Sequence, residues 1–418
     1  MLFGNQDIVF EDNVYANDEL IDIVHSASHT TTPSSHTFTG NIYYDGNINK
    51  LHVNFNADFS DSGYKKETNV NENSQNDPAF IENLSDGVAR MGAGKLVLSY
   101  PIWKGMFKIG TEETYVSAKQ EYNSTKTEIP SSKAKITENN ISGFAEYALP
   151  FKYVQVVAGI RYEHVNFEYT NECSPKDNIN RTHNNWFPSF NASTKIGPVG
   201  INLGYTTKIK RPRYDQLSTE MQYNNRFLYQ TGDPTLLNEI QNTLSLNANW
   251  RWLTLTGAYE VVDNAIYQLG YPYDDDCTAM VKYSNAKETV RKLNIYLNAS
   301  PTIGIWNPRY TVGMEKQYFE TTVIDPREST GTRVVKRNDP MFFVQANNSF
   351  KLKQGWLIDL DYQYTSPFDY VMYKFTKPKH GLNLAVSKSF LKHDALNVRL
   401  AWNDILNKTK EHVCTDYG

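Results

Sequence analysis

The chain has 418 residues, which is more than one ordinary globular core supports, because such cores stop growing near ~250–300 residues. Its formal net charge of −4 argues against a nucleic-acid partner, which would require a basic surface. Three cysteines (Cys173, Cys277 and Cys414) cannot all pair with one another, so we expect no disulfide framework. No apolar run approaches the ~18 residues of a membrane helix, and the first residues, MLFGNQDIVF, do not resemble a signal peptide.

The dominant pattern is an alternation of apolar and polar residues. In residues 51–60, apolar side chains occupy the odd positions and polar ones the even positions, and the segments 201–205, 244–250, 293–299, 356–364 and 396–402 repeat this period. A strand with one apolar and one polar face gives such a pattern. The mean hydropathy of −0.56 fits a soluble protein and a transmembrane β-barrel equally well, because only alternate barrel residues face lipid.

In chain order, residues 1–35 are expected to be irregular, and residues 36–418 to form an antiparallel barrel. No helix of ~12 residues is expected. Each strand is close to the ~9–11 residues that a tilted membrane strand needs. About sixteen strands are predicted, at 36–45, 49–60, 94–100, 104–115, 138–149, 151–165, 184–196, 199–208, 240–250, 252–263, 289–301, 306–319, 341–350, 355–364, 381–391 and 395–404.

The connections alternate between tight and long. The tight ones include DGNI (45–48), IWK (102–104), Gly197–Pro198 and Arg251, whereas the long ones are 61–93, 116–137, 166–183, 209–239, 264–288, 320–340 and 365–380. In an antiparallel meander, alternate connections lie at opposite ends of the sheet, so all the tight connections are expected at one end and all the long ones at the other. Outer-membrane barrels have this asymmetry, with short periplasmic turns and long extracellular loops.

Five of the seven tryptophans lie at or beside the tight connections, namely Trp103, Trp250, Trp252, Trp306 and Trp356. An aromatic girdle at one membrane interface would place them there. The alternative is that they are core aromatics of a soluble β protein. A propeller would show a repeat of ~40–50 residues, which is not present, and a sandwich would not place its long loops at one end.

Two segments carry a resemblance to a known family. RPRYDQL (211–217) and YQTGDPTLLNE (229–239) resemble paired motifs of outer-membrane β-barrels of the TonB-dependent receptor type, common in Bacteroidetes. SKSFL (387–391) and AWNDILN (401–407) resemble its late hairpin and turn. The sequence departs from the pattern at Asp233, where the family has Asn, and at Asn238, where it has Pro. The residues that match or occupy the motif are Arg211, Pro212, Tyr214, Leu217, Gly232, Asp233, Pro234, Leu236, Glu239, Asn403 and Asp404.

The resemblance implies a receptor in the bacterial outer membrane that imports a nutrient such as a glycan or siderophore. Its partners would be outer-membrane lipid and lipopolysaccharide, an unknown extracellular small molecule or glycan, and the TonB system through a plug domain. Transporters of this type have ~22 strands, and neither a plug nor a closing strand is recognised, so the chain is expected to be part of a larger barrel. A passive porin-like channel and a secreted, soluble β-rich glycan-binding protein are the alternatives.

The long segment 209–239 supplies the candidate ligand residues. Arg211, Arg213, Tyr214, Tyr223, Arg226 and Tyr229 can form a charged and stacking surface for a ligand. Lys208 and Lys210 add to the basic group and suit lipopolysaccharide phosphates or an anionic ligand. The plainer alternatives are loop residues that pack on one another and a solvated strand end.

No metal site, cofactor or enzymatic activity is expected. His25, His29 and His36 have a spacing that can suit a metal, but a solvated Ser/Thr-rich segment is favoured over a site. The acidic run 274–276 is expected to be a solvated loop tip rather than a Ca²⁺ site. No GxSxG or HExxH motif is present, and no serine is spaced to pair with His164 or His183. A bridge from Cys173 to Cys277 is geometrically conceivable, but nothing in the sequence supports it.

Overall fold

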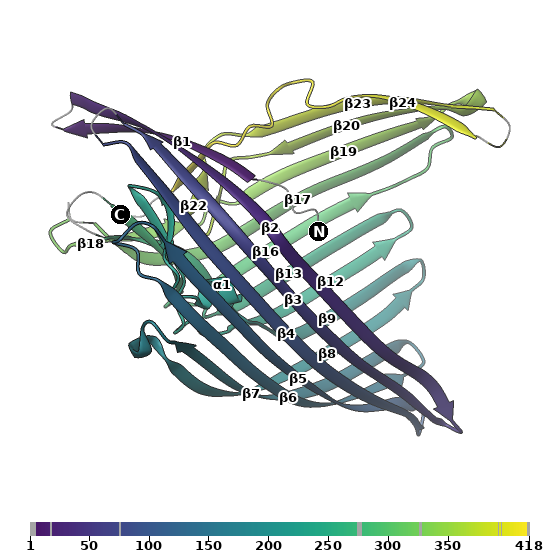
Figure 1. Ribbon diagram of the computed structural model, residues 1–418. Coiled ribbons are helices and arrows are strands. Elements are labelled where there is room, and N and C mark those ends of the chain that lie inside the picture. The colour runs from purple at the N-terminus through teal and green to yellow at the C-terminus, as the bar shows by residue number, and fades with distance from the viewer. Residues whose placement is uncertain are drawn as a thin grey trace.

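The structure, a computed structural model, describes residues 6–16, 19–74, 77–273, 278–325, 328–391, 393 and 395–415. Its main feature is an 18-stranded sheet in which the strands follow one another antiparallel and the whole sheet curls around an interior (Figure 1). In the described residues no helix is both long and apolar enough to cross a membrane. The first and last strands of the sheet, at its two edges, have no pairing with each other among the described residues.

All sixteen predicted strands are present in this sheet. Alternating side chains in each of them place one face toward the interior and one outward. Their bounds are β2 (Glu19–Ile48), β3 (Leu51–Asn73), β4 (Ala79–Ile102), β5 (Gly105–Ser124), β6 (Ser132–Pro150), β7 (Val154–Asn171), β8 (Ile179–Ile196), β9 (Val199–Lys210), β12 (Glu239–Trp250), β13 (Leu253–Asp263), β16 (Val290–Ala299), β17 (Trp306–Ile324), β19 (Met341–Lys351), β20 (Trp356–Thr365), β23 (Lys379–Phe390) and β24 (Leu396–Trp402).

The segment expected to be irregular, residues 1–35, is instead mostly strand where the structure describes it. Strand β1 (Gln6–Ala16) pairs with the first part of β2, which begins at Glu19. The register of β2 against β3 shifts between Thr31 and Ser34, on either side of Pro33. A bulge accommodates the proline, which cannot donate to the ladder, and it reverses which residues face outward. This parity change hid the alternation in the sequence.

The long connections also differ from expectation, because many of them begin as extensions of the wall. Strands β3 and β4 continue through most of 61–93, and β5 and β6 through much of 116–137. The other long connections carry short elements of their own. These are α1 (Tyr214–Leu217), β10 (Gln222–Asn225), β11 (Leu228–Thr231), β14 (Ile266–Pro272), β15 (Ala279–Asn285), β18 (Thr332–Arg337), β21 (Phe368–Tyr370), β22 (Tyr373–Phe375) and the 3₁₀ turn Pro175–Asp177. A second 3₁₀ turn, Lys353–Gly355, lies in the tight connection between β19 and β20, and β25 (Val413–Thr415) follows β24.

Tight and elaborated connections lie at opposite ends of the sheet, as predicted (Figure 1). Several tight turns place a residue at positive φ, including Asn49 (55°), Trp103 (54°) and Arg251 (51°). The first turn lies at residues 49–50 rather than at the predicted DGNI, so β2 is three residues longer than expected at that end. We call the two ends of the sheet the turn end and the loop end.

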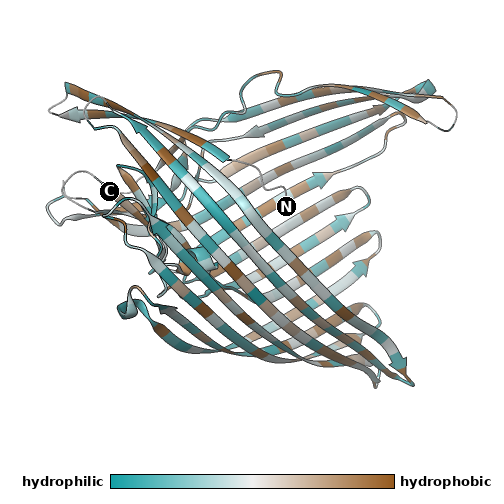
Figure 2. Ribbon diagram, in the orientation of Figure 1, coloured by the Kyte–Doolittle hydropathy of each residue, from teal (hydrophilic) through white to brown (hydrophobic). Residues whose placement is uncertain are grey.

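The predicted apolar face points outward. Phe55, Leu246 and Leu360 have 38%, 41% and 37% of their surface exposed, which is unusual for large apolar residues in a folded protein. In β12, Leu246 is paired with Leu203 on one side and Gly257 on the other, and paired residues share a face. Apolar and polar segments therefore alternate along the strands, as Figure 2 shows. An apolar band of this kind matches the lipid-facing band of a barrel.

Tryptophans border this band at the turn end. Trp103, Trp250 and Trp356 are 75%, 40% and 43% exposed. The indole N–H of Trp306 donates to Asn348 Oδ1 over 3.0 Å, so its polar edge is satisfied while its ring remains at the surface. The predicted girdle is thus supported by exposure, and these tryptophans are not core residues.

Candidate functional site

The segment 211–239 folds back against the interior at the loop end. Its first turn is α1, where the backbone N–H of Arg213 donates to Gln216 Oε1 over 2.9 Å. Strands β10 and β11 then form a hairpin, and β11 pairs in parallel with β15, which joins β14 in a four-stranded sheet. The long polar insertion is therefore a small folded unit and not an extended loop.

Gly232 closes this unit onto α1. Its N–H donates to Ser218 O over 2.9 Å, and the N–H of Asp233 donates to Gln216 O over 2.6 Å. A Cβ at Gly232 would lie 2.4 Å from Gln216 O and 2.5 Å from Ser218 O, both backbone atoms that cannot move independently. The glycine of the motif is required because two backbone segments meet there.

The two acidic residues of the motif, Asp233 and Glu239, anchor the two ends of the stretch that leads from the inserted segment back into β12. Asp233 accepts from the N–H and hydroxyl of Thr235 at 2.8 and 2.6 Å and lies 3.0 Å from Lys282 Nζ. Burial raises the pKa of Asp233, but these hydrogen bonds outweigh it and hold the pKa below its usual range. Glu239, 4% exposed, accepts from the N–H of Ile266 over 2.7 Å and pairs with Lys210 at 3.1 Å.

The apolar motif residues are core residues of the folded segment. Leu217 and Leu236, each 2% exposed, pack in one cluster with Ile136, Phe167 and Tyr169 of the wall. Pro212 and Pro234 are also buried. Most of the matched motif therefore stabilises the fold of this segment.

The three candidate tyrosines lie in two different environments. Tyr223 and Tyr229 are each 4% exposed, with ring centroids 5.5 Å apart, and they pack against Val70 and Ile81 of the wall. Their rings are covered by the protein itself and are not an open stacking surface. Tyr214 is only partly buried and keeps one side toward a cavity, and burial raises its pKa to about 12.

Arg226 is also occupied. Its Nε donates to Glu72 Oε2 over 3.0 Å and its backbone N–H to Glu72 Oε1 over 2.9 Å. Glu72 is 1% exposed and also accepts from the hydroxyl of Ser26 at 3.3 Å. We call this contact the Glu72–Arg226 latch, since it joins the inserted segment to β2 and β3. Sequence reasoning missed Glu72, because no local pattern marks a carboxylate 154 residues from its partner.

The basic group at the end of β9 is largely neutralised. Arg211 lies 2.7 Å from Glu163 and 3.3 Å from Glu138, Arg213 lies 2.7 Å from Asp215, and Lys210 pairs with Glu239 as described. The hydrogen bonds to Asp215 raise the pKa of Arg213, which therefore stays charged. A solvated and internally paired strand end, the plainer alternative, describes this group better than an open anion site.

A chain of ion pairs extends from Arg211 along the interior wall. Glu163 pairs with Arg161 at 2.9 Å, Arg161 with Glu112 at 3.1 Å, and Glu112 with Lys95 at 3.4 Å. The interior is thus polar and charged, in contrast to the outward face. Membrane barrels with polar contents have this distribution.

Glu220 is a buried acid whose side-chain hydrogen-bond partners are neutral amides. It is 5% exposed, and the side chain of Gln120 donates to it. Burial raises its pKa from 4.5 to about 7. Between those two values the folded chain holds a proton that the unfolded chain has released, so stability falls as pH rises.

We therefore expect the segment 211–239 to open more readily at pH 8 than at pH 5, by about 3 kcal/mol at most. Hydrogen exchange of its amides, corrected for the intrinsic pH dependence, measures this difference. Glu220→Gln should flatten the pH dependence, while Glu172→Gln, which removes the partner of the exposed Lys133, should leave it unchanged. An unaltered slope in Glu220→Gln would assign the effect to another group.

The predicted metal and catalytic candidates are not brought together. Each histidine at the N-terminal end pairs with its own carboxylate, His25 with Glu11 at 3.5 Å and His29 with Asp7 at 2.5 Å. The described residues include no cluster of three or more His, Cys, Asp or Glu side chains suited to a metal.

The remaining candidates are also dispersed. His36 pairs with Asp61 at 3.0 Å. His164 and His183 point to opposite faces, because His164 opposes Asn184, the neighbour of His183. Cys173 and Cys414 are free and exposed, whereas the run 274–276 and Cys277 lie outside the described residues.

The late motif forms a turn beside the interior wall. Asp404 adopts a φ of 47°, and its side chain accepts from the backbone N–H of Lys408 at 3.3 Å and from the hydroxyl of Thr409. Its own N–H donates to Asn383 Oδ1 over 2.8 Å. Asn403 is exposed. The turn therefore orients Asn383, which lines the groove described next.

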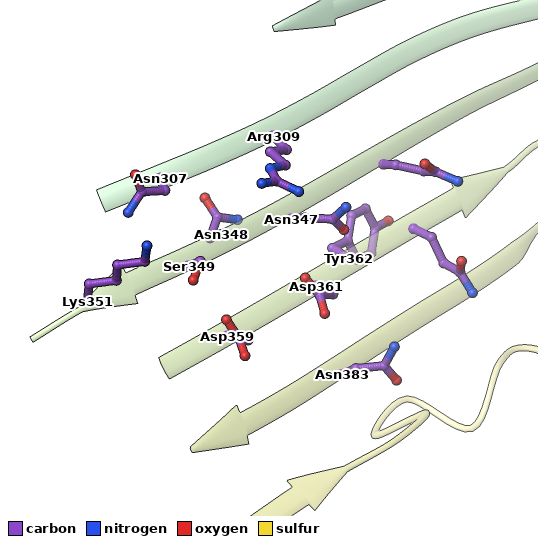
Figure 3. A pocket seen from close by; sticks show the side chains of 12 residues that line it. Asn307, Arg309, Asn347, Asn348, Ser349, Lys351, Asp359, Asp361, Tyr362 and Asn383 are labelled. Carbon is purple, nitrogen blue, oxygen red and sulfur yellow. The ribbon is translucent and has the colours of Figure 1, made fainter. Parts of the chain in front are cut away.

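A polar groove of about 520 Å³ runs along the inner wall of β17, β19, β20 and β23 toward the turn end (Figure 3). Amide and charged side chains from neighbouring strands point into it, as the register requires, since Arg309 opposes Asn347 and Asn347 opposes Asp361. Arg309, Lys351 and Asp361 form no ion pair within the described part of the chain. We call this feature the lumen groove. Its amide and charged lining suits another polar surface or ligand.

Comparison with known proteins shows which family this architecture matches. A sequence model of the outer membrane protein beta-barrel family matches residues 37–418. No curated protein sequence matches the chain.

Among solved structures, the copper transporter OprC is similar with a TM-score of 0.58 and 12% identity, over 98% of this chain and 76% of that one. The hemophore receptor HasR of Serratia marcescens, in complex with HasA and heme, gives 0.55 and 11%, over 94% and 70%. The ferric yersiniabactin uptake receptor FyuA of Yersinia pestis gives 0.54 and 9%, over 92% of this chain and 57% of FyuA. Such identities show a shared fold alone. Because the family match extends over most of its length, the chain belongs to the outer membrane protein beta-barrel family and resides in the bacterial outer membrane.

Proposed function

We propose that this chain is the barrel of an outer-membrane receptor that imports a nutrient ligand by a TonB-dependent route. The observation that carries the proposal is the filling of the loop end from inside. Segments 211–239, 264–273 and 278–288 pack against the inner wall, with Tyr267 and Leu269 in one apolar cluster with Phe319 of β17. A passive pore is expected to keep an aqueous path open there.

The lumen groove supports the same proposal from the other end. Its unpaired Arg309, Lys351 and Asp361 and its amides suit a folded polar domain seated in the barrel, as a plug would be. Burying these groups against complementary partners would recover the hydrogen bonds they now make with water. The plug would carry the coupling to the TonB system, and the ligand, a glycan, siderophore or similar molecule, would be captured at the loop end.

The competing function is a passive porin-like channel, and vesicle swelling separates the two. The full chain reconstituted in phospholipid vesicles should admit arabinose slowly, and removal of residues 218–231 should speed swelling at least tenfold. Equal swelling rates for the two proteins would favour the passive channel. A plug-sized domain encoded in frame before residue 1 would support energy coupling, whereas a bare signal peptide there would count against it.

The soluble glycan-binding alternative is not supported. Its apolar positions would have to lie in a core, but they form the exposed outward band. Lipid and the lipid part of lipopolysaccharide are the partners that such a band fits.

A further inference from the structure

A second cavity lies between the inner wall and the inserted segment. It measures about 120 Å³ and is bounded by β3 to β7 on one side and by α1 on the other. Its lining includes three alanines and three tyrosines, together with Ser62, Lys119, Gln120 and Ser218; the alanines and tyrosines are Ala89, Ala118, Ala134, Tyr64, Tyr169 and Tyr214. Tyr214 is the member of the candidate ligand set that reaches this space.

Small residues on the wall create the space, and the rings define its shape. Gly87 lets the ring of Tyr64 lie flat across the sheet, because a Cβ at Gly87 would be 2.4 Å from Tyr64 Cε1. Tyr169, fully buried, is fixed by a 2.9 Å hydrogen bond between its hydroxyl and Thr219 Oγ1. The cavity is therefore bounded by ring surfaces and methyl groups held in place.

The chemistry of the lining selects the occupant. Most of the polar side chains of the lining already have partners within the protein. The hydroxyl of Tyr169 bonds Thr219 and that of Tyr64 bonds Ser85. The hydroxyl of Ser62 donates to Ala89 O, the amide of Gln120 donates to Glu220, and the hydroxyl oxygen of Ser218 accepts from the N–H of Glu220. A sugar would leave its hydroxyls unpaired against methyl groups, at a cost for each one. An apolar cavity of ~150 Å³ binds benzene, and tyrosine rings favour stacked or edge contacts with another ring.

We propose that this cavity binds a single six-membered aromatic ring carried by the imported ligand, with Tyr214 as the contact on the loop side. The inference rests on the proposed function, which it deepens by naming a chemical feature of the ligand. It gives the inserted segment a binding role in addition to filling the loop end.

The test is calorimetric titration of the full chain in detergent with phenol, indole and glucose. Phenol should bind saturably, and indole, which is larger than the cavity, should bind at least tenfold more weakly. Ala118→Leu, which fills the cavity, should lower phenol affinity at least tenfold. Ala401→Leu, also on the inner face but on β24, should not change the phenol affinity. Comparing the two variants controls for phenol that partitions into the detergent.

Tyr214→Ala provides a second variant if Ala118→Leu does not fold, as judged by circular dichroism. It should also weaken phenol binding at least tenfold. Equal phenol binding by wild type and the folded variant, or glucose binding that the variant abolishes, would overturn the proposal. Vesicle swelling is independent of this titration. If vesicles containing the full chain swell freely while the cavity binds phenol, the proposed function is refuted and the aromatic site is not.

Discussion

Glu72→Gln is expected to release the inserted segment from the wall, lowering its stability against opening by about 3 kcal/mol. Glu72 is 1% exposed, and its carboxylate is the acceptor for both the side chain and the backbone of Arg226. Removing the carboxylate leaves a guanidinium, 19% exposed, without its main counter-charge. Removing one member of a buried pair costs ~3–5 kcal/mol, and the residual exposure of Arg226 argues for the lower end.

Hydrogen exchange of the amides in residues 222–231 would measure this change, and vesicle swelling should increase in parallel. Asp215→Asn removes the partner of an exposed arginine and is the matched control, with an expected cost below ~1 kcal/mol. The double variant Glu72→Leu with Arg226→Met should recover most of the loss, because no charge is then buried alone. Unchanged protection in Glu72→Gln would show that the apolar contacts hold the segment without the latch.

Leu246→Arg is expected to impair barrel assembly, at ~2–4 kcal/mol if the position lies near the bilayer midplane. Leu246 lies in the outward band, beside Leu203, so the arginine would have to enter hydrocarbon or distort the strand. Asp at Leu246, Val53, Phe55 or Leu360 should act in the same direction with a smaller effect. Refolding into vesicles, followed by urea unfolding, measures the difference.

The neighbouring substitution Asn247→Arg is the control for this prediction. Asn247 faces the interior, where it accepts from the hydroxyl of Thr256 over 2.9 Å. The arginine there should cost no more than the lost hydrogen bond, ~1 kcal/mol. Equal assembly of both variants would mean that the band does not contact lipid.

The strands were predictable because their information is local. A period of two in segments such as 244–250 specifies both the strand and its outward face, and a two-residue turn such as 103–104 leaves only the neighbouring strand within reach. The pairing of β1 with β2 was missed because this local signal is interrupted there. Pro33 and the bulge beside it interrupt the period, and pairing along β3 restores the strand.

The site was predicted less well, because its residues meet only after the chain has folded back. Arg226 and Tyr223 were identified as polar and aromatic residues of an external segment, a description that fits a ligand surface and a packed segment equally. The choice between them depends on Glu72 and Val70 of β3, which lie about 150 residues earlier. Nothing in residues 211–239 specifies those contacts.

By itself, the sequence determined the class of fold, the strand order, the outward apolar band and the two unlike ends, because each depends on neighbours a few residues apart. Only the tertiary structure decided that the inserted segment turns inward, that its arginines are already paired, and that a cavity remains beside Tyr214. The free energy of those features comes from burial and ion pairing between distant strands, which local periodicity does not record.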